Sequence, residues 1–123
     1  MESNVYINDV YLGMNKSGLY KGFLEPILLK LLDENGRMYG YEITQKIKTL
    51  TDGELKITEG SLYPLLHRLE ADGILEVEME NIGNRIRKYY SLTKAGKKEK
   101  VTAVNALESF KNTLLLILNP KLA

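Results

Sequence analysis

The chain has 123 residues, no cysteine and a formal net charge of +1, and this length allows one domain with a short appendage. Without cysteine it can form neither disulfides nor thiolate nucleophiles nor thiolate metal sites, which fits a reducing cytoplasm. No N-terminal apolar run of signal-peptide type is present, and the longest apolar run, Leu114 to Leu118, is shorter than the roughly 20 residues that a membrane helix needs. We therefore expect a cytoplasmic protein with no membrane partner.

The charges are unevenly distributed along the chain. An acidic block lies between Glu70 and Glu80, and a basic stretch follows between Arg85 and Lys100, interrupted only by Glu99. Clustered cations set the field near a phosphate backbone even when the total charge is close to zero. An ordinary solvated surface explains the same charges equally well.

Residues 1–18 form a segment whose role the sequence leaves open. Its apolar residues have partly helical spacing, which Gly13 and Gly18 weaken. Such an arm can pack on another element or on a second subunit. The apolar residues are Val5, Tyr6, Ile7, Val10, Tyr11 and Met14.

The first clear helix is predicted from Leu19 to Asp33, with Pro26 tolerable only in or near the first turn. The sequence Asn35-Gly36 ends it. Leu29 points away from the main apolar face, which suggests that the helix is covered twice and that a partner chain provides the second cover. The main face consists of Phe23, Leu24, Ile27, Leu28 and Leu31.

A second helix is predicted from Gly40 to Leu50, and the following loop, 51–57, contains the turn signal Asp52-Gly53. One side of the helix is apolar and is expected to face inward. The inward residues are Ile43, Ile47 and Leu50, and the outward residues are Tyr41, Gln45 and Lys48.

A third helix, from Thr58 to Asp72, has two different faces. Thr58 fits the N-cap position, and Glu59 lies where the helix dipole favours negative charge. Pro64 lies one turn inside the helix, where it removes a backbone hydrogen bond and predicts a slight kink. At about 100° per residue, one side is apolar and the opposite side is largely polar. The apolar side consists of Leu62, Leu65, Leu66 and Leu69, and the other side of Pro64, His67 and Arg68, flanked by Ser61 and Tyr63.

After Gly73 the period of the apolar residues changes from 3.6 to 2, which predicts a strand from residue 75 to residue 80. A four-residue loop, 81–84, leads to a second strand, 85–92. A register that is symmetric about this loop brings acid beside base and apolar beside apolar. The predicted pairs are Glu80 with Arg85, Glu78 with Arg87, Glu76 with Tyr89, and, on the buried face, Leu75 with Tyr90 and Met79 with Ile86.

The last helix is predicted from Thr93 to Asn119. Apolar residues recur in it at alternating intervals of four and three, which is the seam of a coiled coil of about two heptads. A helix that projects beyond the compact part has nothing of its own to bury against, so dimerisation is the simplest explanation, and docking on the same chain is the alternative. The dimerisation candidates are Ala103, Leu107, Phe110, Leu114 and Ile117, together with Leu29.

Three helices followed by a hairpin, in this order, form a winged helix-turn-helix. The predicted fold class is mainly α with a small β-hairpin, that is, a winged helix-turn-helix plus a long C-terminal dimerisation helix. We divide the chain into an N-terminal arm, 1–18, a DNA-binding domain, 19–92, and a dimerisation helix, 93–123.

Three segments of this sequence resemble the PadR family of bacterial transcriptional regulators, in the same order and with similar spacing. They are MYGYEI (38–43), TEGSLYPLLHRLEADGIL (58–75) and RKYYSLTKAG (87–96). The resemblance covers about residues 21–100, and the string GSLYPLLHRLEADG is specific. The single terminal helix is similar to that of the short PadR subfamily.

The resemblance implies a winged-helix dimer that usually represses genes, often for detoxification or efflux, and is often released by a small aromatic or hydrophobic ligand. The family's wing commonly carries a string like Gly-Gly-Arg-Pro-Arg-Lys, which here reads Gly-Asn-Arg-Ile-Arg-Lys over 83–88. The basic residues match the family, whereas Ile86 stands in place of the proline.

The polar side of the third helix is the candidate DNA-contact surface, because hydroxyls and arginine can hold phosphate oxygens and arginine can read guanine in the major groove. The alternative is a solvated face on which Tyr63 covers apolar neighbours. His67 is the only histidine and has no second histidine or cysteine for a metal site, so no metal or cofactor is expected. The candidates are Ser61, Tyr63, Pro64, His67 and Arg68, with Tyr41, Gln45 and Lys48 as second-helix residues that can touch the DNA backbone or remain solvated surface.

Arg85, Arg87 and Lys88 are the candidate phosphate contacts of the hairpin. In the predicted register both arginines have glutamate partners, but exposed pairs are worth only about 0–1 kcal/mol and can reopen toward phosphate. Lys88 has no such partner and is the safer candidate.

The favoured function is a sequence-specific, DNA-binding transcriptional regulator: a homodimeric repressor of a pseudo-palindromic operator in double-stranded DNA, released by a small aromatic or hydrophobic effector. Phe110 and its leucine neighbours can line an effector cavity between subunits, although core packing explains an apolar stripe better. The alternative is a protein-interaction or effector-sensing module of the same fold that no longer contacts DNA, as the acidic block suggests. An enzyme is not expected, because no hydroxyl or carboxylate has a recognisable base partner and no glycine-rich phosphate loop is present.

Overall fold

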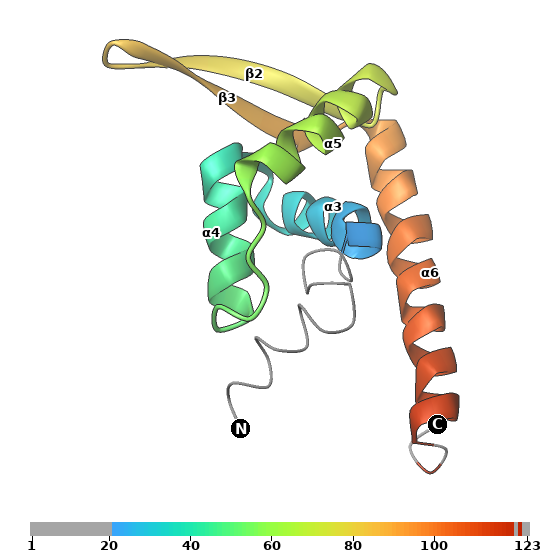
Figure 1. Ribbon diagram of the computed structural model, residues 1–123. Helices are drawn as coiled ribbons and strands as arrows, with labels where there is room; N and C mark the ends of the chain where they lie inside the picture. Colours follow the sequence, from blue (N-terminus) through green and yellow to red (C-terminus); the bar gives the residue numbers. More distant parts are fainter. Residues whose placement is uncertain (1–20, 120, 122–123) are drawn as a thin grey trace.

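The computed structural model describes residues 21–119 and 121, so the arm proposed for 1–18 lies outside the described residues. In chain order the elements are η1 (Lys21–Phe23), α3 (Leu24–Asn35), β1 (Arg37–Tyr39), α4 (Gly40–Leu50), α5 (Glu59–Ala71), β2 (Leu75–Ile82), β3 (Arg85–Leu92) and α6 (Lys94–Leu118). The fold is mainly helical with a small antiparallel sheet, and the prediction of a winged helix-turn-helix with a long C-terminal helix is confirmed (Figure 1).

The helices begin and end close to where the sequence predicts. The helix expected from Leu19 begins with the 3-10 turn η1, and Pro26 lies in the first turn of α3, where its missing N–H costs no hydrogen bond. Thr58 caps α5 as expected, because its hydroxyl accepts a hydrogen bond from the Ser61 N–H at 3.1 Å. The kink expected at Pro64 stays a prediction.

The sheet has the strand order β1-β3-β2, with both pairings antiparallel. The strand β1, only three residues long, was not expected from the sequence. It joins α3 to α4 and pairs with the end of β3 nearest the helices, so it fixes the root of the β2–β3 hairpin beside the first turn of α4.

The hairpin differs from its predicted register by two residues. Glu80 pairs with Arg87, Glu78 with Tyr89 and Val77 with Tyr90, and the strands continue to a two-residue turn, Gly83-Asn84, in place of the four-residue loop. Gly83 has φ +63°, the left-handed conformation that a tight hairpin turn requires at its first position. The predicted pairs of Arg85 with Glu80 and of Arg87 with Glu78 are therefore wrong.

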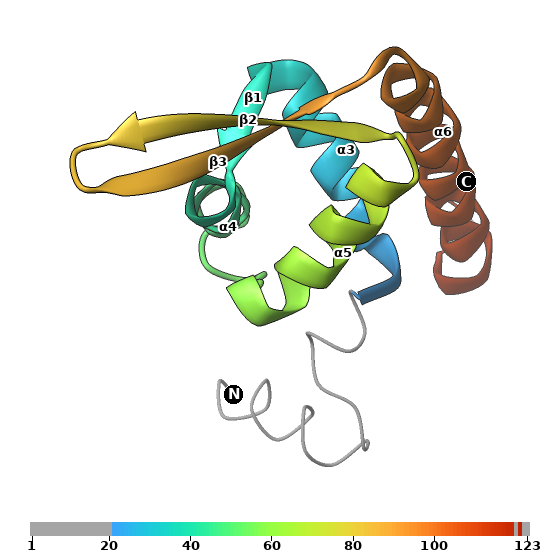
Figure 2. The same cartoon turned by 90° about the horizontal axis from the view of Figure 1, so that it is seen from above.

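The same hairpin is longer than the body that it packs on. Its inner half is buried at Leu75 and Tyr90, but Met79 and Ile86 are 61% and 63% exposed, so the prediction that they face the core is wrong. Seen from above, the hairpin extends well beyond the helices (Figure 2). Below, the wing means the whole hairpin, residues 75–92.

The core lies between α3, α4, α5 and the root of the sheet. Leu29 has no exposed surface within its own chain, so its assignment to the dimer contact is wrong: elements of the same chain provide the second cover of α3. Leu50, predicted to face inward, is 62% exposed because it lies at the last residue of α4, beyond the core. The buried apolar residues are Leu24, Leu28, Leu29, Leu31, Leu32, Met38, Ile43, Ile47, Leu55, Leu62, Leu66, Leu69, Leu75, Tyr90 and Leu92.

The helix α6 leaves the sheet beside α3 and then continues alone (Figure 1). It is attached to α3 and η1 through an ion pair of Lys100 with Asp33 at 3.2 Å and a ring contact of Phe110 with Phe23 at 5.9 Å. By length and composition alone α6 could cross a membrane, with a mean hydropathy of 1.2 in its most apolar window, which for a single helix is weak evidence. Its apolar half also carries the Glu108–Lys111 ion pair, and charged groups are costly inside a bilayer.

Candidate nucleic-acid interface

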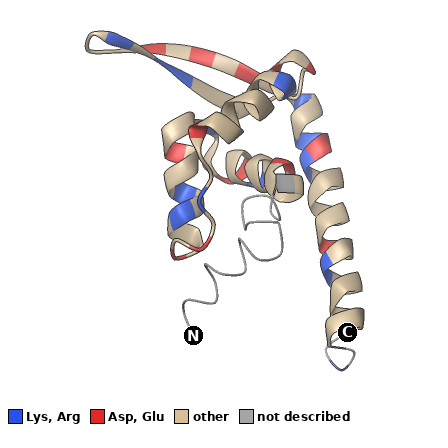
Figure 3. Ribbon diagram, in the orientation of Figure 1, with Lys and Arg blue, Asp and Glu red and all other residues tan. Residues whose placement is uncertain are grey.

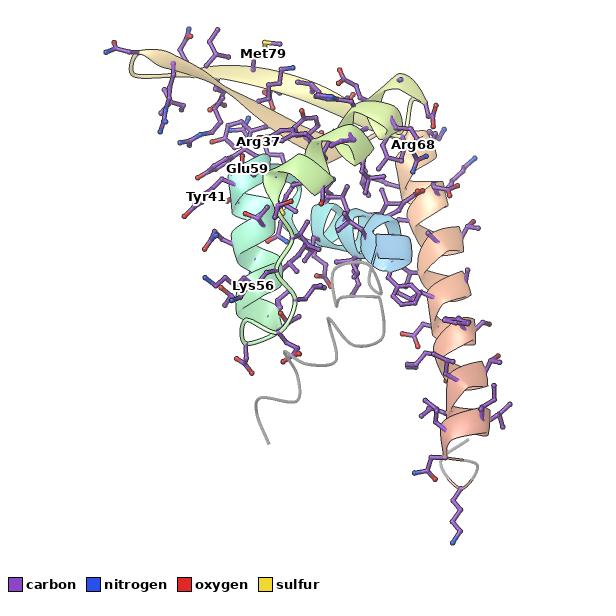
Figure 4. The ribbon with its side chains drawn as sticks, in the orientation of Figure 1. Arg37, Tyr41, Lys56, Glu59, Arg68 and Met79 are labelled. Carbon is purple, nitrogen blue, oxygen red and sulfur yellow. The ribbon has the colours of Figure 1, made fainter. Side chains whose placement is uncertain are left out.

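A groove of about 900 Å³ lies where the wing meets the first turns of α4 and α5. Its walls combine aromatic, apolar and basic side chains from all three elements. The residues that line it, hereafter the groove residues, are Tyr39, Tyr41, Glu59, Tyr63, Met79, Arg85, Ile86, Arg87 and Lys88. Figure 4 shows Tyr41 and Glu59 together at this end of α5, with Met79 on the wing above them.

The N-terminal end of α5 is held against α4 by a close contact between Gly40 and Tyr63. A Cβ atom added at Gly40 would overlap the Tyr63 hydroxyl, so only glycine lets the two helices approach in this way. Partial burial, and secondarily the nearby Glu59 carboxylate, raise the pKa of Tyr63. Tyr63 thus packs against Gly40 and also lines the groove.

Two cations of the wing are free to bind an anion. Arg85 and Lys88 are exposed, and within the described part of the chain neither has a hydrogen-bond or ion-pair partner. Figure 3 shows basic residues at the wing tip and along β3, whereas the acidic residues of the hairpin lie on β2. The wing therefore presents one basic strand, and that strand lines the groove.

Arg87 is also in the groove, but its guanidinium is occupied. It stacks over the Tyr39 ring at 4.0 Å and donates a hydrogen bond to the Tyr89 hydroxyl at 3.3 Å. The bond to Tyr89 is the largest cause that raises the Arg87 pKa. A contact of Arg87 with phosphate would have to replace these interactions.

The glutamates expected to pair with Arg85 and Arg87 pair elsewhere. Arg37 of β1 binds Glu78 at 2.8 Å and Glu80 at 2.7 Å, one with each terminal nitrogen. These bonds, to Glu80 first and Glu78 second, raise the Arg37 pKa. The acidic strand of the wing is thus partly neutralised from outside the hairpin.

The structure separates the predicted site residues into two groups. Tyr41, Tyr63, Arg85, Arg87 and Lys88 come together in the groove. Four others lie on α5 outside it, with exposed side chains: Ser61, Pro64, His67 and Arg68.

The guanidinium of Arg68 is engaged in ion pairs within the chain. It binds Glu25 of α3 at 2.7 Å and approaches Asp72 at 3.7 Å. In Figure 4 it lies at the α6 end of α5, far along the helix from Glu59. Its use as a DNA contact stays a prediction, and that contact would compete with these two carboxylates.

Sequence reasoning missed five residues of this region. Tyr39 and Arg37 lie on the short strand β1, which carries no periodicity signal of its own. Met79 and Ile86 were assigned to the core, and Glu59 was considered only as a helix-dipole partner. The two tyrosines on either side of Gly40, Tyr39 and Tyr41, were the available signal for an aromatic groove wall.

Comparison with known proteins agrees with this architecture. Residues 28–101, more than half of the chain, match the Transcriptional regulator PadR-like family. Over 81 residues the chain is 35% identical to the transcriptional regulator Rv3488 of Mycobacterium tuberculosis, an alignment that covers 66% of this chain and 73% of that protein.

Solved structures give the same result. A transcriptional regulator from Clostridium thermocellum superposes with a TM-score of 0.75 at 30% identity, covering 82% of this chain and 98% of that one. Bacillus subtilis PadR, solved in complex with operator DNA, superposes with a TM-score of 0.60 at 26% identity, covering 67% of this chain and 45% of that one.

Proposed function

This chain belongs to the PadR-like family of transcriptional regulators, and we propose that it is a homodimeric, sequence-specific repressor that binds operator DNA through α5 and the wing. The observation that carries the proposal is the groove, in which free cations of the wing stand beside the exposed end of α5. The operator complex of the Bacillus subtilis relative supports a DNA ligand for this fold. A cytoplasmic location follows from this function.

In the proposed complex α5 enters the major groove, and the wing lies on the adjacent backbone. Arg85 and Lys88 bind phosphates, and Tyr41 donates to a phosphate from the first turn of α4. The exposed ridge of α5, with Pro64 and His67, faces the base edges. In this arrangement residues 19–92 form the DNA-binding unit and residues 93–123 the dimerisation unit.

Dimerisation is proposed through the outer half of α6. Leu114 and Ile117 lie on the predicted seam, and Ile117 is 71% exposed in the single chain. A second copy that pairs along this seam would bury both residues. Two α5 helices about 34–36 Å apart would then read a pseudo-palindromic operator.

An effector site is proposed beside the root of this seam. An apolar cavity of about 290 Å³ lies between η1, α3 and α6, a volume near the lower end of the range for small-molecule pockets. A small aromatic or hydrophobic molecule fits its lining and could move α6 relative to α3. The lining residues are Gly22, Phe23, Pro26, Ala103, Ala106, Leu107 and Phe110.

Fluorescence anisotropy with a labelled duplex from the region upstream of the gene tests the proposal. Binding should weaken steeply between 50 and 200 mM salt, as counterion release from about six phosphate contacts requires, by roughly a thousandfold. A scrambled duplex of equal length is the control for sequence specificity. Absence of salt-sensitive binding to any duplex would exclude DNA as the ligand.

The second candidate function is a protein-interaction or effector-sensing module of the same fold. The carboxylate of Glu59 inside the groove favours it, because a carboxylate repels phosphate. Charge reversal at Arg68 and Lys88 distinguishes the two functions: regulation that survives both substitutions points to this second function.

A further inference from the structure

One arginine outside the wing, Arg37, forms ion pairs with two glutamates of the wing. Arg37 lies on β1, immediately before α4, and its fork binds two carboxylates of β2 that follow each other on one face of the strand, Glu78 and Glu80. The N–O distances of 2.8 and 2.7 Å are those of charge-assisted hydrogen bonds. The pair therefore links β1 to β2 across β3, the strand that lies between them.

The same guanidinium also contacts β3. It lies 4.0 Å from the centre of the Tyr89 ring, and Tyr89 meets Tyr39 edge-to-face at 5.5 Å. Arg87 stacks on the other member of this aromatic pair, Tyr39, at 4.0 Å. A continuous layer of two arginines and two tyrosines thus covers this face of the sheet, with Arg37 at one end and Arg87 at the other.

The charges of the hairpin explain what Arg37 adds. The hairpin carries as many glutamates as basic residues, so on its own it has no excess positive charge with which to approach a phosphate backbone. Arg37 brings a positive charge to the glutamates Glu78 and Glu80, while Arg85 and Lys88 remain unpaired within the described residues. Arg37 of β1 thus supplies the positive charge by which this surface exceeds the balanced charges of the hairpin.

We propose that Arg37 is a positioning residue for DNA binding, which acts by partly neutralising Glu78 and Glu80 and by tying the wing to β1, without touching DNA itself. This inference rests on the proposed function and deepens it. It assigns the direct phosphate contacts of the wing to Arg85 and Lys88, and it assigns the stacked Arg87 to the support of the wing.

The test is anisotropy of the labelled upstream duplex with the full-length protein at several salt concentrations. R37Q should weaken binding about three- to tenfold, because the carboxylates of Glu78 and Glu80 then repel the DNA phosphates unopposed. Its salt slope should match wild type, whereas K88Q should lower the slope by about 0.9 through the loss of one phosphate contact. The triple variant R37Q/E78Q/E80Q should bind within about twofold of wild type.

R37K and E78Q/E80Q complete the set. R37K keeps the charge and should bind within about threefold of wild type, and E78Q/E80Q should bind at least as tightly as wild type. Circular dichroism melts check the fold of each variant. Because the ion pairs are partly exposed, these substitutions should change the free energy of unfolding only slightly.

Three results would overturn the inference. They are a salt slope of R37Q that is lowered as in K88Q, a triple variant that binds the duplex as weakly as R37Q does, and an R37Q affinity equal to that of wild type. Failure of wild type itself to bind any duplex overturns the proposed function instead, so the two failures are distinguishable.

Discussion

Gly40 and Tyr63 form the contact that sets the distance between α4 and α5. The glycine is buried at the first residue of α4, and the tyrosine hydroxyl occupies the space where any other residue would place its Cβ. Because Tyr63 also lines the groove, this packing contact and the proposed DNA surface share one side chain.

We predict that Gly40→Ala destabilises the protein by about 1–3 kcal/mol, since overpacking a tight contact forces shifts in its neighbours. Chemical denaturation followed by circular dichroism measures the change. Gly60→Ala is the matched control, because an added Cβ there meets nothing closer than 3.8 Å, and its stability should be equal to wild type or higher. Equal loss in both variants would contradict the packing argument.

At single residues, sequence reasoning succeeded where a side chain lies in the middle of an element and failed near ends. Ile43 and Ile47 are buried as predicted, but Leu50, on the same face, lies beyond the core. Leu29 was assigned to a second chain because a helical face was considered without its later neighbours. The burial of a helical residue depends on which other elements pack against the helix, and the spacing of apolar residues within that helix does not contain this information.

Among the elements, the wing shows most clearly what the sequence leaves undetermined. The alternation of apolar and acidic residues separated the two sides of the hairpin, although it did not show that the core ends before Met79 and Ile86. A shift of two residues keeps every side chain on its side, so the pattern could not select the register. The tight turn at Gly83 and the pairing of β1 with β3 select it. The short β1 has too few residues for a pattern, and it exists because β3 offers it a free edge.

The junction between the wing and α6 depends on one hydroxyl. Thr93 caps α6 by accepting from the Gly96 N–H at 3.0 Å, and it donates to the Gly73 carbonyl at 2.6 Å. Gly96 also lies against the Ile74 carbonyl, where no Cβ would fit. The start of α6 is therefore fastened to the turn between α5 and β2.

We predict that Thr93→Val lowers the free energy of unfolding by about 1–2 kcal/mol, because the shape is kept while the Gly96 N–H and the Gly73 carbonyl lose their hydrogen-bond partner. Thr93→Ser retains the hydroxyl and should stay within about 0.5 kcal/mol of wild type. Denaturant melts of the two variants measure both. A serine variant as unstable as the valine variant would show that the methyl group, and not the hydroxyl, matters.

At the scale of the whole molecule, α6 divides into an attached half and a free half. Ala103 packs on the core of its own chain, whereas Leu114 and Ile117 are exposed. The sequence predicted the length of this helix correctly, and its dimerisation seam stays a prediction. It could not show that the seam changes from intramolecular packing to open surface near Phe110, because that depends on where α3 ends its contact with α6.

We predict that Ile117→Asp converts the proposed dimer to a monomer and weakens operator binding by more than tenfold, because the two DNA-binding units are then no longer linked and must bind the operator separately. Sedimentation equilibrium and anisotropy measure the two effects. Asn112→Asp places the same charge on the opposite side of α6 and should change neither. An Ile117→Asp variant that remains dimeric would show that the copies meet elsewhere.

Among the described residues the buried core closes within one chain, while Leu116, Ile117 and Leu118 at the outer end of α6 are exposed. If copies pair there, dilution separates them without unfolding either. Occupancy of a palindrome at low abundance then rises with the square of the cellular concentration. The rate at which a cell makes this protein would itself act as a control, sharpening the threshold between an open and a silenced promoter.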